Sequence, residues 1–328
     1  MKNLKYHFQL WMIPALVLLA GSLWARPMAP ESVSLDRLST EIVWQQVHQL
    51  KEGERPRVVL VLGGGGARGL SHIGVLRVLE EERIPIDQIV GISVGALLGS
   101  LYSGGVSVDQ LESMANEIGW NKLTDYSKVG VMKILLTEEL LSTRRMEEYL
   151  ERHLGKKYFS DLNIPFSCIA TDIRSGDRVV FIEGPVALAA RASATIPGLF
   201  RPVEYRHRAL VDGGLTDVLP TDLVPKDDWT VVVGILPRTG FENEEVSSVL
   251  TTLVRSIEIQ KEVMVEEKKK LADFLIEPDV GSISMMDLAK NKDAIEAGTR
   301  ETRRRALDLK KLIIKKIIQR KERNIGER

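Results

Sequence analysis

The hydrophobic pattern is strongest in two successive turns that each join a predicted strand to a predicted helix. Residues 58–62 form a continuous apolar, β-branched run, which is typical of a strand buried in a parallel sheet. Glycines at residues 63–66 end this run, and apolar side chains then recur at helical spacing over residues 70–79. A second apolar run, residues 86–92, leads into Ser93 and then into small apolar residues that start another helix. The pattern predicts two strand-turn-helix units, one directly after the other.

Apolar runs and helical periodicity also predict the other elements of the chain. Strands are expected over residues 166–171, 179–182, 209–211, 231–235 and 274–276, and helices over residues 34–50, 107–118, 143–155, 185–192 and 246–271. Ser107 with Gln110 three residues later is a capping-box pattern at the start of one helix. Residues 120–141 are apolar without clean periodicity, which fits an acyl groove or lid and fits an ordinary packed insertion equally well.

The first glycine turn is compatible with several kinds of binding site. The sequence from Gly64 to Gly69 satisfies the G-x-G-x-x-G pattern of dinucleotide-binding folds, which also need an acidic residue at the end of the next strand. That strand ends instead in Ile92 and Ser93, and no Lys-Ser/Thr pair follows the glycines as a phosphate loop would require. The turn does predict backbone N–H groups at a helix N-terminus, where negative charge is favoured.

The second turn has the pattern of a nucleophile elbow. Gly91 and Gly95 flank Ser93 in a G-x-S-x-G sequence, and small residues at these positions allow the sharp bend that exposes the serine Oγ. A serine in this place can also be a simple helix N-cap. The preceding strand, the following helix and the donor-rich turn upstream together favour the nucleophile.

The N-terminal residues have the composition of an export signal. Basic residues precede an uncharged run over residues 8–25, whose apolar core is short for a membrane span and contains Pro14. We therefore predict a signal peptide over residues 1–25, with an uncleaved anchor as the alternative, and an exported protein that is periplasmic or secreted. Residues 26–56 are predicted to form a helical arm and a charged linker into the main domain.

Composition and charge exclude some partners. The 45 basic residues balance the 45 acidic residues, so the chain has no overall attraction to nucleic acid. Cys168 is the single cysteine, lies within an apolar run, and is expected to be a buried core thiol without a disulfide. We expect no metal and no cofactor.

Residues 299–328 are predicted to form a basic C-terminal helix. Leu309, Ile313 and Ile317 make an apolar stripe among many lysines and arginines, although other isoleucines interrupt the basic side. One hypothesis is that this helix attracts an anionic membrane surface. The alternative is a solvated terminal helix that docks on the domain.

Four ordered motifs resemble the signatures of the patatin-like phospholipases, including the small bacterial members and the catalytic domain of neuropathy target esterase. The motifs are Gly64 to Gly69 with His72 to Leu76, Gly91 to Gly95, Ala192 to Pro197, and Asp212 to Gly214. The resemblance covers residues 57–298, which we take as the catalytic domain. Four motifs in the family's order are far more specific than any one of them.

This resemblance implies a fold, an activity and a set of site residues. The fold would be a three-layer α/β/α sandwich, of the α/β class, with a mainly parallel central sheet. Ser93 would be the nucleophile, Asp212 the proton acceptor, and Gly64, Gly65 and Gly66, with Arg68 beside them, the oxyanion hole. Supporting positions in the motifs would be Gly91, Gly95, Gly213 and Gly214. The substrate would be a lipid acyl ester, most often a phospholipid or lysophospholipid.

Asp212 has a different interpretation without the resemblance. Asp-Gly is a common hairpin signal, so residue pattern alone favours a turn residue at this position. As a base, Asp212 needs a pKa above its ordinary value of about 3.9, and burial would raise the pKa. One departure from the family is visible, because many relatives have asparagines where this chain has Asp217 and Val218.

The histidines test the predicted dyad against a triad. Of the five histidines, only His72 follows the glycine turn closely enough to be considered as a base for Ser93. Its place in the motif suggests instead a structural role for the turn. The alternatives to a Ser93–Asp212 acyl hydrolase are therefore a Ser-His-Asp esterase that uses His72, and a non-catalytic lipid-binding protein on the same fold.

Overall fold

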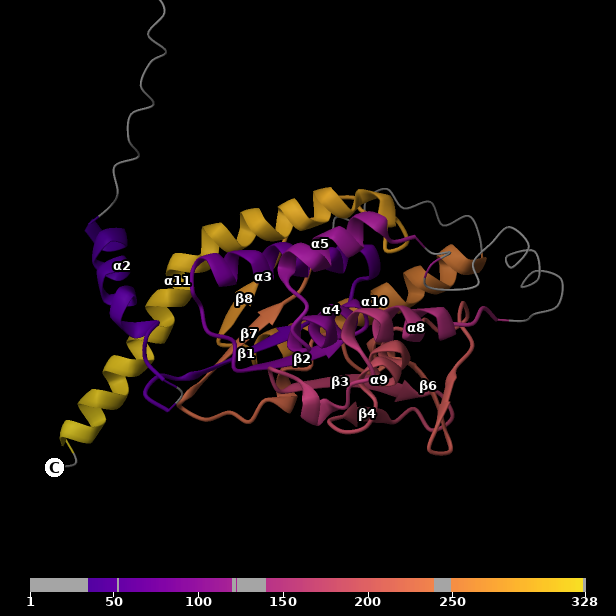
Figure 1. Cartoon of the computed structure of the whole chain (residues 1–328), viewed down its shortest axis with the longest axis horizontal. Coiled ribbons are helices and arrows are strands. Elements are labelled where there is room, and N and C mark those ends of the chain that lie inside the picture. Colours follow the sequence, from indigo (N-terminus) through magenta and orange to yellow (C-terminus); the bar gives the residue numbers. More distant parts are fainter. Residues whose placement is uncertain (1–34, 52, 120–121, 123–139, 239–248, 327–328) are drawn as a thin grey trace, which may run out of the picture. The chain divides into compact units, whose positions relative to one another are not determined.

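The computed structural model describes residues 35–51, 53–119, 122, 140–238 and 249–326 (Figure 1). The chain divides into two compact units, Met1–Val43 and Trp44–Arg328. In the first unit the described residues begin helix α2 (Leu35–Val47), and the Thr40 hydroxyl donates a hydrogen bond to the Asp36 carbonyl within it. The predicted signal segment lies outside the described residues. Among the helices that are described, none has the length and apolarity needed to cross a membrane.

The second unit is built on an eight-stranded sheet among its described residues. Its strands are β1 (Arg57–Leu62), β2 (Gln88–Ile92), β3 (Phe166–Asp172), β4 (Arg178–Phe181), β5 (Val203–Tyr205), β6 (Arg208–Asp212), β7 (Thr230–Ile235) and β8 (Phe274–Ile276). Hydrogen-bonded neighbours follow the order β5-β6-β3-β2-β1-β7-β8, and β4 also pairs with β3. The neighbouring pairs β3–β2, β2–β1, β1–β7 and β7–β8 are parallel. Strands β4 and β6 pair antiparallel with β3, and β5 pairs antiparallel with β6. The predicted, mainly parallel sheet is confirmed.

Helices cover both faces of this sheet, which makes three layers. The helices are α3 (Ser71–Glu81), α4 (Val94–Ser103), α5 (Val108–Glu117), α8 (Arg144–Leu154), α9 (Val186–Ser193), α10 (Val249–Lys269) and α11 (Asn291–Gly326). Short 3-10 turns are η1 (Gly66–Leu70), η2 (Phe159–Asp161), η3 (Gly213–Leu215), η4 (Thr221–Leu223) and η5 (Leu288–Lys290). The capping box of Ser107 and Gln110 is present at the start of α5, as its sequence predicts.

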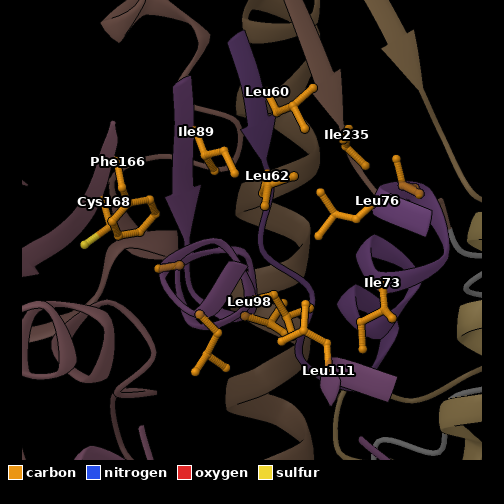
Figure 2. Packing of buried hydrophobic residues seen from close by; sticks show 14 of the residues in the cluster. Leu60, Leu62, Ile73, Leu76, Ile89, Leu98, Leu111, Phe166, Cys168 and Ile235 are labelled. Atoms are coloured by element: carbon orange, nitrogen blue, oxygen red, sulfur yellow. The ribbon is translucent and has the colours of Figure 1, made fainter. Parts of the chain in front are cut away.

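Side chains of β1 alternate between two hydrophobic clusters, because a strand in the middle of a sheet buries both faces. Leu60 and Leu62 pack with Ile73 and Leu76 of α3 and with Leu98 of α4 (Figure 2). Cys168 belongs to the same cluster, where burial raises the pKa of its thiol above the ordinary value, as expected for a core cysteine. The opposite face holds Val59 and Val61 of β1 together with side chains of β7 and α10.

The hairpin of β5 and β6 was only partly predicted. Residues 209–211 were expected as a strand, but β5 was not, because it has three residues and a glutamate between two apolar positions. The two strands are joined by Arg206 and His207, whose φ angles of 46° and 62° suit a tight hairpin turn. The Asp-Gly sequence at Asp212 is therefore not the hairpin turn, since it lies at the opposite end of β6.

Helix α11 differs from the basic C-terminal helix that the sequence suggested. It is one helix from Asn291 to Gly326, so the boundary expected after residue 298 lies inside it, and it lies beside α3 (Figure 1). The stripe of Leu309, Ile313 and Ile317 is buried in the core, so it is not available to a lipid surface. An apolar stripe has the same sequence pattern whether it covers a membrane or its own domain.

Candidate active site

Ser93 lies in a strained turn between β2 and α4. Its backbone has φ 55° and ψ −125°, a conformation that side-chain-bearing residues rarely adopt. The flanking glycines allow the bend. A Cβ on Gly91 would lie 2.6 Å from the Gly95 carbonyl oxygen, and one on Gly95 would lie 2.3 Å from the Leu62 carbonyl oxygen. The local geometry is that of a nucleophile elbow.

The sheet register brings Asp212 to this elbow. Ile169 of β3 pairs with both Ile92 of β2 and a residue of β4, so β2 and β4 occupy opposite edges of β3. The next residue, Ala170, pairs with both β4 and Asp212. Strand β6 therefore pairs with the same edge of β3 as β2 does, starting where β2 ends. Ile92 pairs with Ile169 of β3, and Asp212 pairs with the next residue, Ala170. Ser93 and Asp212 meet where one partner strand of β3 ends and the other takes its place.

The two side chains are directly hydrogen-bonded. The Ser93 hydroxyl donates to Oδ2 of Asp212 at 2.6 Å, and Oδ1 of Asp212 accepts the Gly214 backbone N–H at 2.7 Å. Both residues are only 6% exposed. Burial raises the pKa of Asp212, and the positive charge of Lys261 and these two hydrogen bonds offset part of that increase. A raised pKa makes the carboxylate a stronger proton acceptor than an exposed aspartate.

The glycine turn presents backbone donors beside Ser93. A Cβ on Gly64 would lie 3.4 Å from the Ser93 Cβ, so these two positions are neighbours. Among the described residues, the N–H groups of Gly64, Gly65 and Gly66 have no hydrogen-bond acceptor in the protein. The next amide, that of Ala67, is already bonded to the Met285 carbonyl at 2.8 Å. The open donors are thus the three that the sequence suggested for an oxyanion hole.

Two other residues near the turn have structural partners. Arg68 is buried, and its Nε donates to the Ile283 carbonyl at 2.5 Å. His72 is fully buried, and its Nε2 donates to the Gly63 carbonyl at 2.9 Å. Burial lowers the pKa of His72 to about 4, so the ring is neutral at pH 7. These contacts favour a supporting role for His72 in the turn and do not favour a triad, because the hydroxyl of Ser93 is bonded to Asp212.

Residue pattern did not assign a role to Ser193. It lies at the end of α9 in the third motif, and its Oγ accepts the backbone N–H of Ser93 at 2.9 Å. This hydrogen bond satisfies the amide of the residue with the strained backbone. Ser193 therefore helps to fix the elbow, which explains why its motif accompanies the other three.

The departure at Asp217 has a clear structural account. Its carboxylate is fully buried and accepts the N–H groups of Val218 at 2.8 Å and Leu219 at 3.2 Å. It also pairs with Arg178 and Lys268, each at 2.8 Å. The segment that follows Asp212 is therefore held by charge-assisted hydrogen bonds, which an asparagine could make only in part.

Two pockets are lined by different residues of the glycine turn. One is an apolar cavity of about 100 Å³ that Ser93 and Gly66 line together with side chains of α4, α5 and α8, including Leu97, Met114 and Leu150. The other is more polar, has a volume of about 110 Å³, and is lined by Gly64, Gly65 and residues of α10. Among the described residues, no group of three histidine, cysteine or acidic side chains is placed to bind a metal ion.

The three-layer fold and the elbow serine bonded to a buried aspartate place this protein among the α/β proteins with a nucleophile elbow. Residues 60–225 match the profile of the patatin-like phospholipases, and the chain belongs to this family. The resemblance that the four motifs suggested is confirmed.

Several relatives are known by sequence. The chain is 37% identical over 175 residues to an uncharacterized NTE family protein of Mycobacterium tuberculosis, covering 52% of this chain and 46% of that protein. A second such protein of this organism is 29% identical over 267 residues, covering 73% of this chain and 44% of that protein. Patatin-like phospholipase domain-containing protein 6 of Mus musculus is 32% identical over 185 residues, which is 54% of this chain and 13% of the mouse protein. The chain thus spans about half the length of the mycobacterial relatives.

A solved structure supports the fold assignment. VipD from Legionella pneumophila is similar with a TM-score of 0.52 and 16% sequence identity, covering 78% of this chain and 67% of VipD. At this level of identity the likeness concerns the fold alone. The predicted α/β/α sandwich is therefore confirmed.

Proposed function

We propose that this protein is a serine lipid acyl hydrolase in which Ser93 and Asp212 form the catalytic dyad. The observation that carries the proposal is the 2.6 Å hydrogen bond from the Ser93 hydroxyl to a buried aspartate whose pKa is raised. In this mechanism Ser93 attacks the ester carbonyl while Asp212 accepts the hydroxyl proton and later returns it to the leaving alcohol. Water then hydrolyses the acyl-enzyme, with Asp212 again accepting a proton.

The glycine turn supplies the electrostatic part of this mechanism. The N–H groups of Gly64, Gly65 and Gly66 have no acceptor among the described residues, and Gly64 is next to Ser93. Donors that are free in the resting protein can bind the oxyanion without breaking another hydrogen bond. Loss of one such donor costs about 3 kcal/mol of transition-state stabilisation in related chemistry.

A phospholipid or lysophospholipid is the substrate class that we propose. The family to which the chain belongs supports a lipid ester. The apolar cavity next to Ser93 supports an acyl chain, because its lining is almost entirely hydrocarbon from α4, α5 and α8. Binding there would bury the chain against leucine and methionine side chains, which is favourable in proportion to the apolar area removed from water.

Covalent labelling tests the nucleophile. A fluorophosphonate probe should modify wild-type protein at Ser93, and Ser93→Ala should abolish both labelling and release of fatty acid from a mixed phospholipid extract analysed by mass spectrometry. Ser160→Ala is a matched control, since Ser160 is exposed on η2 and outside the site. Full hydrolysis by folded Ser93→Ala would overturn the dyad. Lipid binding without labelling or hydrolysis in the wild type would instead support a non-catalytic lipid-binding protein.

We also propose export of the protein and attraction to an anionic membrane surface. Cleavage within residues 1–25 is tested by sequencing the N-terminus of protein recovered from cells.

An anionic membrane surface would be attracted through exposed cations of α11 alone, such as Lys315 and Lys321, because the apolar stripe is buried. Lys315→Glu with Lys321→Glu should then reduce co-sedimentation with anionic vesicles at low salt, whereas unchanged co-sedimentation would exclude this surface.

A further inference from the structure

Lys261 brings a positive charge to the reactive centre from a distant part of the sequence. It lies on α10, and its ammonium is 3.8 Å from the position that a Cβ on Gly64 would occupy. It is 2.9 Å from the corresponding position on Gly214. Gly64 adjoins Ser93, and the Gly214 amide is bonded to Asp212. The absence of side chains at these two glycines leaves the space in which the ammonium lies.

The ammonium of Lys261 has no direct partner in the described part of the chain. Its positive charge attracts Asp212 at longer range, and the two carboxylate oxygens of Asp212 already accept hydrogen bonds from Ser93 and Gly214. Other lysines of α10 do form ion pairs, such as Lys268 with Asp217. The three N–H donors of Lys261 are therefore available to a ligand.

The polar pocket around Lys261 suits an anion. Its lining includes two carboxylates, and each has its own cation: Asp217 pairs with Arg178 and Lys268, and Glu262 lies 4.0 Å from Arg255. The same pocket contains Gly64 and Gly65, whose amides have no acceptor among the described residues. A half-buried ammonium in this pocket is a group that binds phosphate oxygens, and the backbone donors beside it stay available to the ester carbonyl.

The pocket also has the right place relative to the scissile ester. Ser93 and Gly66 line the apolar cavity and not the polar pocket, whereas Gly64, Gly65 and Lys261 line the polar pocket and not the apolar cavity. An ester carbonyl at Ser93 has its acyl chain on one side and its alcohol on the other. With the acyl chain in the apolar cavity, the alcohol portion is directed to Lys261.

We propose that Lys261 binds the phosphate group on the alcohol portion of the substrate and makes the site selective for phosphate-bearing lipid esters. This inference rests on the proposed acyl hydrolase function and adds a specificity-determining residue to it. The phosphate would accept hydrogen bonds from the ammonium while the ester carbonyl lies against Ser93 and the glycine amides.

A matched pair of substrates tests this role. Myristoyl glycerol and myristoyl glycerol 3-phosphate share the acyl ester and differ in the phosphate. Lys261→Met should lower the ratio of kcat/KM for the phosphorylated over the neutral ester by about 10-fold or more, mainly through KM, since a hydrogen bond to a charged group contributes that much. Lys261→Arg should restore most of the ratio. Lys270→Met is the control, because Lys270 follows α10, is exposed and pairs with Glu267.

Two kinetic outcomes would overturn the inference. An equal loss of kcat on both esters at a pH above the acid limb, with an unchanged ratio, would assign Lys261 to the oxyanion and not to the phosphate. An unchanged ratio with unchanged rates would remove Lys261 from the site. If the wild type hydrolyses neither ester, the proposed function fails, and the phosphate site is judged by binding.

Calorimetric titration supplies that binding measurement. Glycerol 3-phosphate should bind wild-type protein and Ser93→Ala, and about 10-fold more weakly to Lys261→Met. Absence of binding to the wild type would overturn the inference. Equal affinity for inorganic phosphate, together with an unchanged substrate ratio, would show a site for free anions and would also overturn the assignment to a lipid headgroup.

Discussion

Asp212 and Asp217 lie at the two ends of one short segment, and both are buried, yet their surroundings differ greatly. Asp217 accepts two backbone N–H groups and pairs with Arg178 and Lys268 at 2.8 Å. Asp212 accepts one amide and the hydroxyl of Ser93, and its cation is Lys261, which makes no direct contact with it. A carboxylate that is fully compensated holds a turn in place, whereas one that is less compensated has a raised pKa and can take a proton.

This contrast shows why residue type alone does not define a catalytic group. Each aspartate is close to glycine or to a turn, and neither has a local sequence feature that distinguishes a base from a structural ion. The difference arises from elements far away in the sequence, because β4 and α10 supply the cations of Asp217. Three of the four predictions below alter one side of this comparison, and one concerns His72 beside the glycine turn.

The largest effect is expected for Asp212→Asn. The amide keeps the shape of the side chain but cannot accept the Ser93 proton, so kcat for ester hydrolysis should fall by about 1,000-fold or more. Thermal unfolding should show no loss of stability. The raised pKa means that ionised Asp212 lowers stability above the pKa of the unfolded chain, and the uncharged amide removes that cost. Activity near the wild-type level in this variant would exclude Asp212 as the base.

Acid should destabilise the folded protein through His72. Its folded pKa is about 4 and its ordinary value is 6.5, so the unfolded chain binds a proton as the pH falls below 6.5 while the folded protein does not. The free energy of unfolding should therefore fall by about 3 kcal/mol as the pH is lowered from 6.5 to 4. Urea unfolding at both pH values measures it, and His72→Gln should flatten the dependence. A wild-type stability that stays level over this range would contradict the buried neutral ring.

Asp217→Ala should reduce stability more than catalysis. It leaves two amides and the shared cations Arg178 and Lys268 without this partner, although Asp222 still pairs with both. We expect a loss of about 2 kcal/mol in the free energy of unfolding, below the value for a fully buried pair because the cations are partly exposed. The measurement is urea denaturation together with kcat of the folded fraction. A catalytic loss as large as that of Asp212→Asn would end the distinction between the two aspartates.

The smallest effect is a change in pH dependence on removing Lys261. Its charge lowers the pKa of Asp212, so Lys261→Met should raise that pKa further. The ionised carboxylate is the active form, and the acid limb of kcat/KM for a neutral ester should therefore move to higher pH. Lys270→Met should leave the limb in place, since Lys270 pairs with Glu267 outside the site. A limb that moves to lower pH in Lys261→Met would refute this electrostatic coupling.

Local patterns predicted the first half of the site well. Residues 58–62 and 86–92 have the composition of buried strands, and β1 and β2 lie there. The glycines around Ser93 predict the elbow because the bend has strict steric needs that appear directly in the sequence. Such features depend on neighbours in the chain, which the sequence displays.

Residues that meet through the tertiary structure were not predicted in the same way. Asp212 resembled a hairpin turn, and only the family resemblance gave it a role, because its meeting with Ser93 depends on the register of β3. Lys261 is one of many charged residues on α10, and no spacing relates it to Ser93. The apolar stripe of α11 predicted that this helix covers an apolar surface, but the sequence did not show that the surface is α3 of the same domain.

The packing of α11 limits how this protein can be shortened. Leu309, Ile313 and Ile317 fill the core beside α3, and Lys310 inserts its ammonium to pair with Glu82. Removing the helix would expose the apolar side chains of α3 and the core against which it packs, and truncated variants would aggregate through this exposed apolar surface. Engineered minimal versions should accordingly retain the polypeptide at least through Ile317.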